Sequence, residues 1–482
     1  MPSKEPLVEA LEKYRKEQVY PLHTPGHKGG RGAAASLHAL LGKKALASDV
    51  SLMSELDDIH EPSTCLKEAQ DLAAKLYGAK QSFFAVNGTT CALHAMLLGA
   101  LQPGDKILLP RNAHSSVYGG LVLAGLKPVY LLPHYSEAWN LSLQVTPEQV
   151  AGALETDPDI KAVFITSPNY FGLAADLVKI AELAHKHNIV LLVDEAHGPH
   201  LGFSQVLPPS ALQCGADVVA QSTHKILGAL TQCSMLHIQG QRVQAGRMAA
   251  AMSLVTTTSP NYLLLASLDA SRAQIAARGQ NMIEAAAAAA DLLRQKLRAV
   301  LGLMVLDGSM IGSGGVVALD KTKVTINVKN LGITGIEAGE MLRQAGIAVE
   351  LVDETNVLFL VTYADATEEF TKIADKIAAT LDKGRKLVPK KLTVPTFQEM
   401  PQVIFHPREA FFAPRETVPF AAAQGRICAE KICFYPPGIP ALVPGEKITK
   451  SIQEYCKAML KLGMHLTGPQ DSTLQTVQVI KP

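Results

Sequence analysis

Short apolar runs alternate with helical patterns through the first half of the chain. Four such runs are bordered by Gly, Pro or Asp, at residues 106–110, 128–132, 162–166 and 189–194. They are too short for core helices and are typical of strands buried on both faces of a parallel sheet. A helical pattern at 177–188 precedes the last run. The pattern therefore predicts a βαβ series and an α/β fold class with a mostly parallel sheet.

The pattern changes after Pro260. The Ala-rich stretch 262–301 predicts a long, bent helix that could link two domains, because alanine favours helices. Strand-like runs then mix with helical patterns at 336–345 and 368–381, which indicates a smaller α+β domain. The basic, Pro-containing segment 383–395 is interpreted as a linker.

These patterns predict consecutive parts with separate cores. The N-terminal residues alternate charges with Leu and Val at helical spacing and lack the apolar stretch of a signal peptide. The predicted parts are a helical arm at 1–20, a large domain at 21–265, the linking helix and small α+β domain at 266–390, and a C-terminal unit at 391–482.

The composition excludes several classes of protein. The 482 residues carry 45 basic and 44 acidic side chains, so no strong attraction to nucleic-acid phosphates is available. Hydrophobic residues make up 48% of the chain, which argues against disorder. Gly, Pro and His interrupt the apolar runs, so we expect no membrane span. The seven cysteines show no CxxC pair, which predicts reduced thiols in a cytoplasmic protein and no metal site.

Lys225 is the first candidate for covalent chemistry. It lies in the string QSTHKILGALTQCS, before a run of small and apolar residues. Partial desolvation makes a lysine amine available to form a Schiff base with an aldehyde. The alternative is a surface lysine beside a histidine, which is the commoner case.

Asp194 ends the apolar run 189–194, at the carboxyl end of a predicted parallel strand. Ligands of α/β sheets bind at such ends, and a carboxylate there could pair with a protonated pyridine nitrogen. Such a pair makes a cofactor ring a strong electron sink. The alternative is an aspartate that caps the following turn. We interpret Glu195 and His197 as neighbours of this position.

The segment 87–100 is a candidate phosphate site. Its Gly-Thr-Thr turn opens an amphipathic helix, whose first N–H groups and two hydroxyls suit a phosphate. An ordinary threonine N-cap is an equally good interpretation. Two residues beside the lysine could add phosphate contacts: Ser222 and His224.

His114 follows the predicted strand 106–110, in the string PRNAHSS. A histidine at a strand end can stack its imidazole on a planar ring, although a lone loop histidine is more often solvated. The order of the four features is the one that a single cofactor site would explain: phosphate turn, ring stacker, ring-nitrogen partner and Schiff-base lysine.

The chain resembles the fold-type I pyridoxal-phosphate (PLP) enzymes, and within them the ornithine/lysine/arginine decarboxylase family. The short bacterial branch, with its biosynthetic arginine decarboxylases, is the most similar part. The strings that carry the resemblance are HTPGHKGG (23–30), LDDIHEP (56–62), FFAVNGTT, PRNAHSS, VDEAHGPH, STHKILGALTQ, YPPGIPALVPGE (435–446) and GPQDSTL (468–474). It implies an aspartate-aminotransferase-like large domain that binds PLP, a small α+β domain and a C-terminal α+β decarboxylase domain.

The resemblance also implies roles on matching motifs. Lys225 would bond covalently to PLP, Asp194 would pair with the pyridine nitrogen and His114 would stack on the ring, which makes these three the expected catalytic residues. The implied cofactor contacts also include Gly88, Thr89, Thr90, His197, Ser222 and His224. One departure is Cys233, where the family usually has Ser or Ala, and we expect no effect on the chemistry.

The implied reaction removes CO₂ from a basic L-amino acid and leaves its amine. Arginine to agmatine is the first expectation, with lysine to cadaverine and ornithine to putrescine as alternatives. Lys225 or a nearby histidine would supply the proton at Cα. The distal charge of the substrate needs an acidic partner, although each candidate could instead serve as a turn or cap. The candidates are Glu446, Asp471, Asp57 and Asp58.

The family assembles as homodimers or higher homo-oligomers with the active site at the interface, so HTPGHKGG is expected to reach the neighbour's cofactor. Longer relatives form decamers through an N-terminal wing domain, and this chain starts close to the linker region, so we expect no such decamer. Polyamine synthesis is the expected role. Two alternatives stay open: another fold-type I enzyme, such as an aminotransferase or lyase, would lack YPPGIP, and a non-catalytic PLP-binding paralogue would have lost Lys225 or Asp194.

Overall fold

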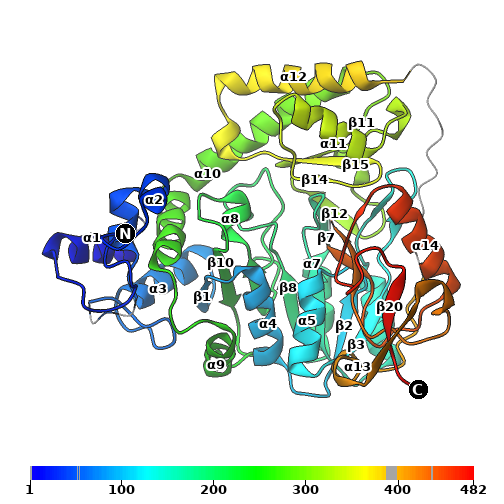
Figure 1. The fold of residues 1–482 in the computed structure, drawn as a ribbon, viewed down its shortest axis with the longest axis horizontal. Helices are drawn as coiled ribbons and strands as arrows, with labels where there is room; N and C mark the ends of the chain where they lie inside the picture. Colours follow the sequence, from blue (N-terminus) through cyan, green and yellow to red (C-terminus); the bar gives the residue numbers. More distant parts are fainter. Residues whose placement is uncertain (1–2, 52, 54, 387–398, 436–437) are drawn as a thin grey trace. The chain divides into compact units, whose positions relative to one another are not determined.

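A computed structural model describes residues 3–51, 53, 55–386, 399–435 and 438–482 (Figure 1). The chain forms two compact units. The first comprises Met1–Ala100, Leu192–Ser204 and Pro209–Met282, and the second comprises Leu101–Leu191, Gln205–Pro208 and Ile283–Pro482. The chain passes between the units within strand β8 (Val190–Asp194) and within helix α10 (Tyr262–Arg298).

The first unit contains paired strands of a larger sheet and the helices around them. Its elements are α1 (Pro6–Glu17), α2 (Ala35–Ser48), α3 (Cys65–Tyr77), β1 (Gln81–Ala85), α4 (Gly88–Ala100), β9 (Val218–Gln221), α8 (Thr223–Ile226), β10 (Ser234–Ile238) and α9 (Ala245–Val255). Strands β1 and β9 each pair antiparallel with β10, and β8 pairs parallel with β9. Strands β1, β8 and β9 therefore run in the same direction.

Helix α4 differs from the prediction made for it. We expected an amphipathic helix, but most of its side chains are buried, from Thr89 to Leu97. The reason is that α4 packs both on the sheet strands and on α9. A helix enclosed on several sides has no polar face to maintain.

The second unit begins with a parallel βαβ arrangement. Its elements there are β2 (Lys106–Pro110), α5 (Ser115–Ala124), β3 (Lys127–Leu131), β4 (Tyr135–Ser136), β5 (Leu141–Ser142), α6 (Pro147–Thr156), β6 (Ile160–Thr166), β7 (Leu173–Ala175) and α7 (Leu177–Lys186). Strand β2 pairs parallel with both β3 and β6. The four apolar runs thus form β2, β3, β6 and β8, shifted by at most two residues at their ends, and α7 occupies the predicted helix.

The remainder of the second unit contains the smaller sheets. Its elements are β11 (Met304–Val305), β12 (Val316–Leu319), β13 (Lys323–Asn327), α11 (Gly335–Gln344), β14 (Leu351–Val352), β15 (Asn356–Leu360), α12 (Glu368–Gly384), α13 (Pro407–Phe412), β16 (Arg415–Pro419), β17 (Ile432–Tyr435), β18 (Ile439–Leu442), α14 (Lys450–Lys461), β19 (His465–Thr467) and β20 (Thr476–Ile480). One apolar cluster joins α10 to β13, β15, α11 and α12. A second lies among β17, β19, β20 and α14.

These two clusters match the small α+β part and the C-terminal part expected from the sequence, while the domain boundaries themselves stay predictions. The expected boundary at residue 390 and the linker from residue 387 onward lie outside the described residues, as do two prolines of YPPGIP at 436 and 437. Among the described residues, no helix combines the length and the apolar character needed to cross a membrane.

Candidate active site

Three parallel strands of the first unit end at the same edge of its sheet, and most of the candidate residues follow those ends. Gly88 comes shortly after β1, Asp194 ends β8, and Ser222 follows β9. Asp194 lies opposite Ala220 in the pairing of β8 with β9. This is the edge at which α/β sheets bind ligands.

Asp194 is a buried carboxylate, with 3% of its surface exposed. Its Oδ1 accepts the N–H of Ala196 at 3.0 Å. Burial raises the pKa of Asp194 above its ordinary value, and the positive charge of Lys225 opposes that rise. A carboxylate that stays ionised here requires a nearby cation, because desolvation penalises its charge.

Lys225 lies on the short helix α8 and is half-buried. Its Nζ lies 2.9 Å from Nε2 of His197, whose side chain is 4% exposed. From its position His197 was expected to be only a neighbour of Asp194, and the resemblance alone placed it among the cofactor contacts. In the structure its Nε2 lies within hydrogen-bond distance of the lysine amine.

The predicted phosphate residues divide into two groups. Thr89 is buried, and its hydroxyl contacts the hydroxyls of Ser222 and, at 2.8 Å, of Ser234. Thr90 is exposed. The sequence did not single out Ser234, because it begins the distant strand β10 and no motif marks it.

Gly88 and His224 also have definite partners. The N–H of Gly88 donates to the carbonyl of Gln232 at 2.9 Å. Apart from its chain neighbours and the adjacent backbone of α4, nothing lies within 4 Å of the position that a Cβ at Gly88 would take. Nδ1 of His224 lies 2.9 Å from the carbonyl oxygen of Cys233. Open space over Gly88 at the start of α4 is compatible with an anion, since helix N-termini attract negative charge.

A buried polar network, absent from the sequence predictions, lies next to Asp194. Glu195 accepts the side-chain N–H of Gln221 at 2.7 Å, and Gln221 contacts His237 at 3.1 Å. His237 in turn contacts the hydroxyl of Ser82 at 2.7 Å. Burial raises the pKa of Glu195 to about 8 and lowers that of His237 to about 3. The network joins strands β1, β9 and β10 behind the candidate site.

His114 belongs to the second unit, where it is the N-cap of α5. Its Nδ1 accepts the N–H of Ser116 at 3.2 Å and lies 2.7 Å from the hydroxyl of the same serine. Because Nδ1 acts as an acceptor, the neutral ring carries its proton on Nε2. The capping bond fixes the imidazole relative to the helix.

Three of the four predicted substrate carboxylates already have strong partners. Asp57 accepts backbone N–H groups of residues 63, 64, 66 and 67, and so caps α3. Asp471 accepts bonds from Thr473 and Thr476. Glu446 forms an ion pair with Arg111 at 2.9 Å. Asp58 is half-buried and, among the described residues, accepts one hydrogen bond, from the N–H of His60 at 2.8 Å.

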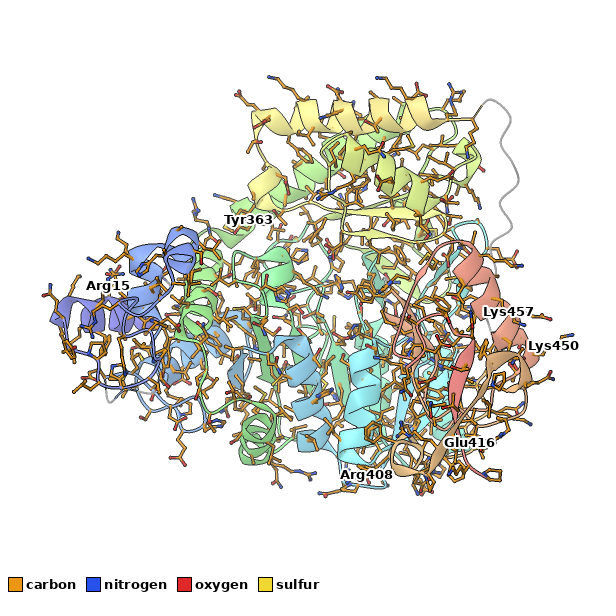
Figure 2. All side chains as sticks on the ribbon, in the orientation of Figure 1. Arg15, Tyr363, Arg408, Glu416, Lys450 and Lys457 are labelled. Atoms are coloured by element: carbon orange, nitrogen blue, oxygen red, sulfur yellow. The ribbon has the colours of Figure 1, made fainter. Side chains whose placement is uncertain are left out.

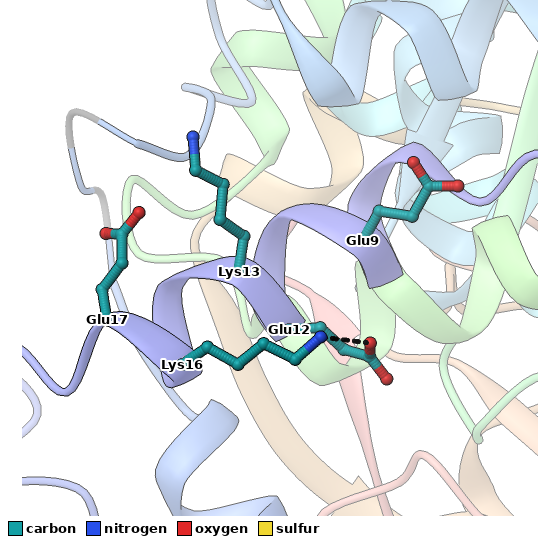
Figure 3. Close-up of a pocket in the computed structure, with 5 residues that line it drawn as sticks. All are labelled: Glu9, Glu12, Lys13, Lys16 and Glu17. Atoms are coloured by element: carbon teal, nitrogen blue, oxygen red, sulfur yellow. Dashed lines mark ion pairs between the residues drawn. The ribbon is translucent and has the colours of Figure 1, made fainter.

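Two hollows lie elsewhere in the first unit. One, of about 400 Å³, runs along α1 and is lined by Glu9, Glu12, Lys13, Lys16 and Glu17 (Figure 3). These exposed charges of both signs form a solvated helix face, with Lys16 and Glu12 3.8 Å apart. The other, of about 170 Å³, lies between β1 and α9. No group of His, Cys, Asp and Glu within the described ranges is suited to hold a metal ion.

Known protein families and relatives match most of this chain. Models of the Orn/Lys/Arg decarboxylase major domain and C-terminal domain match residues 5–311 and 390–478. An arginine decarboxylase of Bacillus anthracis is 41% identical over 481 residues, 99% of this chain and 97% of the relative. One of Bacillus subtilis is 39% identical, covering 99% and 98%. A solved lysine decarboxylase of Francisella novicida has a TM-score of 0.85 at 23% identity, covering 99% of this chain and 81% of that one.

The structural likeness confirms the expected fold class, a fold-type I large domain followed by a small domain and a C-terminal domain. The two matched models together span most of the chain and include every string that carried the resemblance. The chain belongs to the Orn/Lys/Arg decarboxylase family.

Proposed function

We propose that this protein is a PLP-dependent decarboxylase that converts arginine to agmatine. The observation that carries the proposal is the placement of a buried carboxylate, Asp194, and of the Lys225 amine, 2.9 Å from His197, at the ligand-binding edge of the sheet. Arginine is the first choice because the two relatives at 41% and 39% identity are named arginine decarboxylases. Lysine and then ornithine are the alternatives.

The residues at this edge fit PLP by their chemistry. Lys225 supplies an amine for the aldehyde, Asp194 a buried anion for the ring nitrogen, and the start of α4 a place for the phosphate. Thr89, Ser222 and His224 are the proposed phosphate contacts, with Gly88 leaving room for them and Thr90 as a further contact. When bound, PLP supplies the electron sink that permits loss of CO₂ from Cα.

Asp194 is proposed to hold a proton on the ring nitrogen. Its burial strengthens this role, because an ion pair is stronger in a low-dielectric environment than in water. In the described chain, burial raises the pKa of Asp194 and the positive charge of Lys225 acts to lower it. When the cofactor is bound, its protonated ring nitrogen would be the cation that pairs with Asp194.

Lys225 and His197 are proposed to act together in the proton transfer to Cα. His197 orients the lysine amine through the 2.9 Å contact, and Lys225 is the proposed donor of the proton that Cα receives after CO₂ leaves. His114 is proposed to stack on the ring from the start of α5.

Asp58 is the carboxylate that we propose for the distal charge of the substrate. Asp57, Asp471 and Glu446 are engaged in a helix cap, a turn and an ion pair, whereas Asp58 has one hydrogen bond among the described residues. A half-buried carboxylate can pair with a guanidinium group without a large desolvation cost.

We further propose a cytoplasmic homodimer with the active site at its interface and a role in polyamine synthesis. The seven free cysteines support a reducing compartment. A match to the C-terminal decarboxylase model argues against an aminotransferase or a β-eliminating lyase, and the presence of both Lys225 and Asp194 argues against a non-catalytic paralogue.

The test is an amine-product and CO₂ assay with arginine, lysine and ornithine side by side, on the wild type and on Lys225→Ala. We expect agmatine to be the main product, and Lys225→Ala to lose both CO₂ release and the visible absorption band of the bound cofactor. CO₂ release from none of the three, in protein that shows the band, would overturn the proposal. Asp58→Asn is expected to raise KM for arginine, with Asp71→Asn as its exposed control.

A further inference from the structure

The C-terminal part of the chain contacts the segment that carries His114 at three places, all within the second unit. The first place is the loop before α5, the second is the start of α5, and the third is its end. We call the contacting residues Arg111, Gly438, Glu446 and Arg408 the clamp.

At the first place, Arg111 extends from the end of β2 into the C-terminal part. Its Nη1 donates to the carbonyl of Pro440 at 2.8 Å. Its Nη2 donates to the carbonyl of Ala441 at 3.2 Å and to Oε2 of Glu446 at 2.9 Å. Arg111 is 7% exposed and Glu446 1% exposed, so the pair is buried. Removing one partner of such a buried ion pair destabilises the fold, because the other charge is left buried without a counter-charge.

Arg111 also connects this pair to α5. The hydroxyl of Tyr118, on α5, accepts from Nη1 of Arg111 at 3.0 Å and donates to the carbonyl of Arg111 at 2.8 Å. Burial acts to lower the pKa of Arg111, but the effects of Glu446, Tyr118 and Tyr130 outweigh burial and raise that pKa. The guanidinium therefore stays charged and links β2, α5 and the C-terminal part.

At the second place, Gly438 lies beside His114 and bonds to the next residue. The N–H of Ser115 donates to the carbonyl of Gly438 at 3.1 Å. A Cβ on Gly438 would lie 3.3 Å from Cδ2 of the His114 ring and 3.0 Å from the ring of Tyr435. The φ of Gly438 is +83°, a conformation that other residues rarely adopt. Glycine thus allows the backbone to lie against the imidazole.

At the third place, Arg408 holds the end of α5. Its Nη1 donates to the carbonyls of Leu123 at 2.9 Å and Val122 at 3.2 Å. Helix α13, which carries Arg408, packs against α5. An arginine at the last carbonyls of a helix satisfies groups that have no partner inside the helix.

We propose that the C-terminal part is a positioning element of the active site, which holds α5 at both ends and so fixes the imidazole of its N-cap, His114. The inference rests on the proposed function, in which His114 stacks on the cofactor ring. The clamp residues are positioning residues: they set where His114 lies and touch no reacting atom. The segments involved are far apart in sequence, and they belong to the two separately matched family models.

The test uses two clamp variants and one control in the full-length protein with PLP. Arg111→Met/Glu446→Leu removes the buried pair without leaving a lone charge, and Arg408→Met removes the exposed contact at the other end of α5. Glu416→Gln is the control, because Glu416 lies on β16 of the same C-terminal part and pairs with Arg426 (Figure 2, which labels Arg408 and Glu416). Each variant is also made with His114→Ala.

Three readouts are measured: hydrogen exchange of peptides covering 111–124, visible circular dichroism of bound PLP, and kcat with KM. We expect the paired variant to raise exchange, change the dichroism and lower kcat on the order of 10- to 100-fold, with KM within about twofold. Arg408→Met gives a smaller change of the same kind, and Glu416→Gln gives none. In the His114→Ala background the clamp variants should cause no further change in dichroism or kcat.

Equal losses with and without His114 would overturn the clamp, because they would show an effect that does not pass through the imidazole. Unchanged dichroism and kcat despite raised exchange would also overturn it. If the paired variant fails to fold, Arg408→Met decides by the same criteria. If the wild type does not decarboxylate any substrate, only the proposed function is contradicted. Hydrogen exchange and the visible circular dichroism of bound PLP still test the clamp.

Discussion

Asp194 and Glu446 are both buried carboxylates, 3% and 1% exposed, but they have different partners. Glu446 has an arginine at 2.9 Å and the N–H of Val443 at 3.0 Å on the same oxygen. Asp194 has the N–H of Ala196 and, for positive charge, the field of Lys225. Burial raises the pKa of both groups, and a cation opposes the rise in both.

The difference separates a structural carboxylate from a functional one. A carboxylate bonded directly to an arginine is committed to the fold, because losing either partner strands a buried charge. A carboxylate whose positive partner is a reactive lysine can accept a cationic ligand in its place. On this reasoning Glu446 stabilises the second unit, whereas Asp194 is available for the role proposed above, that of partner to a ring nitrogen.

The largest effect is expected for Glu446→Leu. It leaves the Arg111 guanidinium buried without its counter-charge, which should lower the free energy of unfolding by about 3–5 kcal/mol. Urea unfolding of the wild type, the single variant and Arg111→Met/Glu446→Leu measures this. The double variant should recover most of the lost free energy of unfolding. If Glu446→Leu is as stable as the wild type, Glu446 does not stabilise the fold.

Asp194→Asn is expected to have the opposite profile. Asparagine can still accept the Ala196 N–H, so the free energy of unfolding should change by less than about 1 kcal/mol. It cannot hold a proton on a ring nitrogen, so kcat should fall on the order of 10²- to 10³-fold. Steady-state kinetics beside urea unfolding gives both numbers. If Asp194→Asn loses as much unfolding free energy as Glu446→Leu and keeps its kcat, Asp194 is a structural carboxylate and not a functional one.

His197→Phe removes the contact to the lysine amine but keeps an aromatic ring in a buried position. One hydrogen bond to a charged group corresponds to about 1.5–3 kcal/mol, so we expect kcat to fall about 10- to 100-fold. The pH–rate profile should change as well, since the orientation of the amine affects proton transfer. If kcat and the pH–rate profile are both unchanged, His197 has no part in proton transfer.

The smallest effect is expected for Asp57→Asn, which tests a third buried carboxylate. Burial acts to raise the pKa of Asp57, but four backbone N–H donors outweigh it and hold the pKa below its ordinary value. Weakening this cap should cost about 1 kcal/mol of unfolding free energy at neutral pH. KM for arginine should stay unchanged, and a large rise in KM would restore Asp57 as a substrate residue.

The pH dependence of that stability difference has a definite sign. A carboxyl whose pKa is lower in the folded state stabilises the fold above its unfolded pKa of about 4 and stops doing so as the pH falls through the folded pKa. The difference between wild type and Asp57→Asn should therefore be constant near neutrality and shrink below about pH 4. Urea unfolding at several pH values measures it.

Sequence patterns predicted the strands of the α/β region well, because strands buried on both faces leave uninterrupted apolar runs. Asp194 was a candidate because it ends such a run, and Lys225 because it lies in a distinctive string. The amphipathic prediction for α4 was wrong, since only the packed structure shows that α9 covers its outer side.

Contacts between distant segments explain the rest. Glu446 lies 335 residues from Arg111, and no local pattern links the two. Ser234 reaches Thr89 only because β10 pairs with β1, and His197 reaches Lys225 only because β8 pairs with β9. A sequence shows which side chains can do chemistry, but strand order decides which of them meet.

The most direct test of the account is to reduce the PLP-loaded protein with borohydride and to map the modified residue by peptide mass spectrometry. Reduction fixes the cofactor on the lysine that holds it. We predict one modified peptide, with the label on Lys225, and loss of that label in Lys225→Ala. A label on another lysine, or active protein without any label, would contradict it.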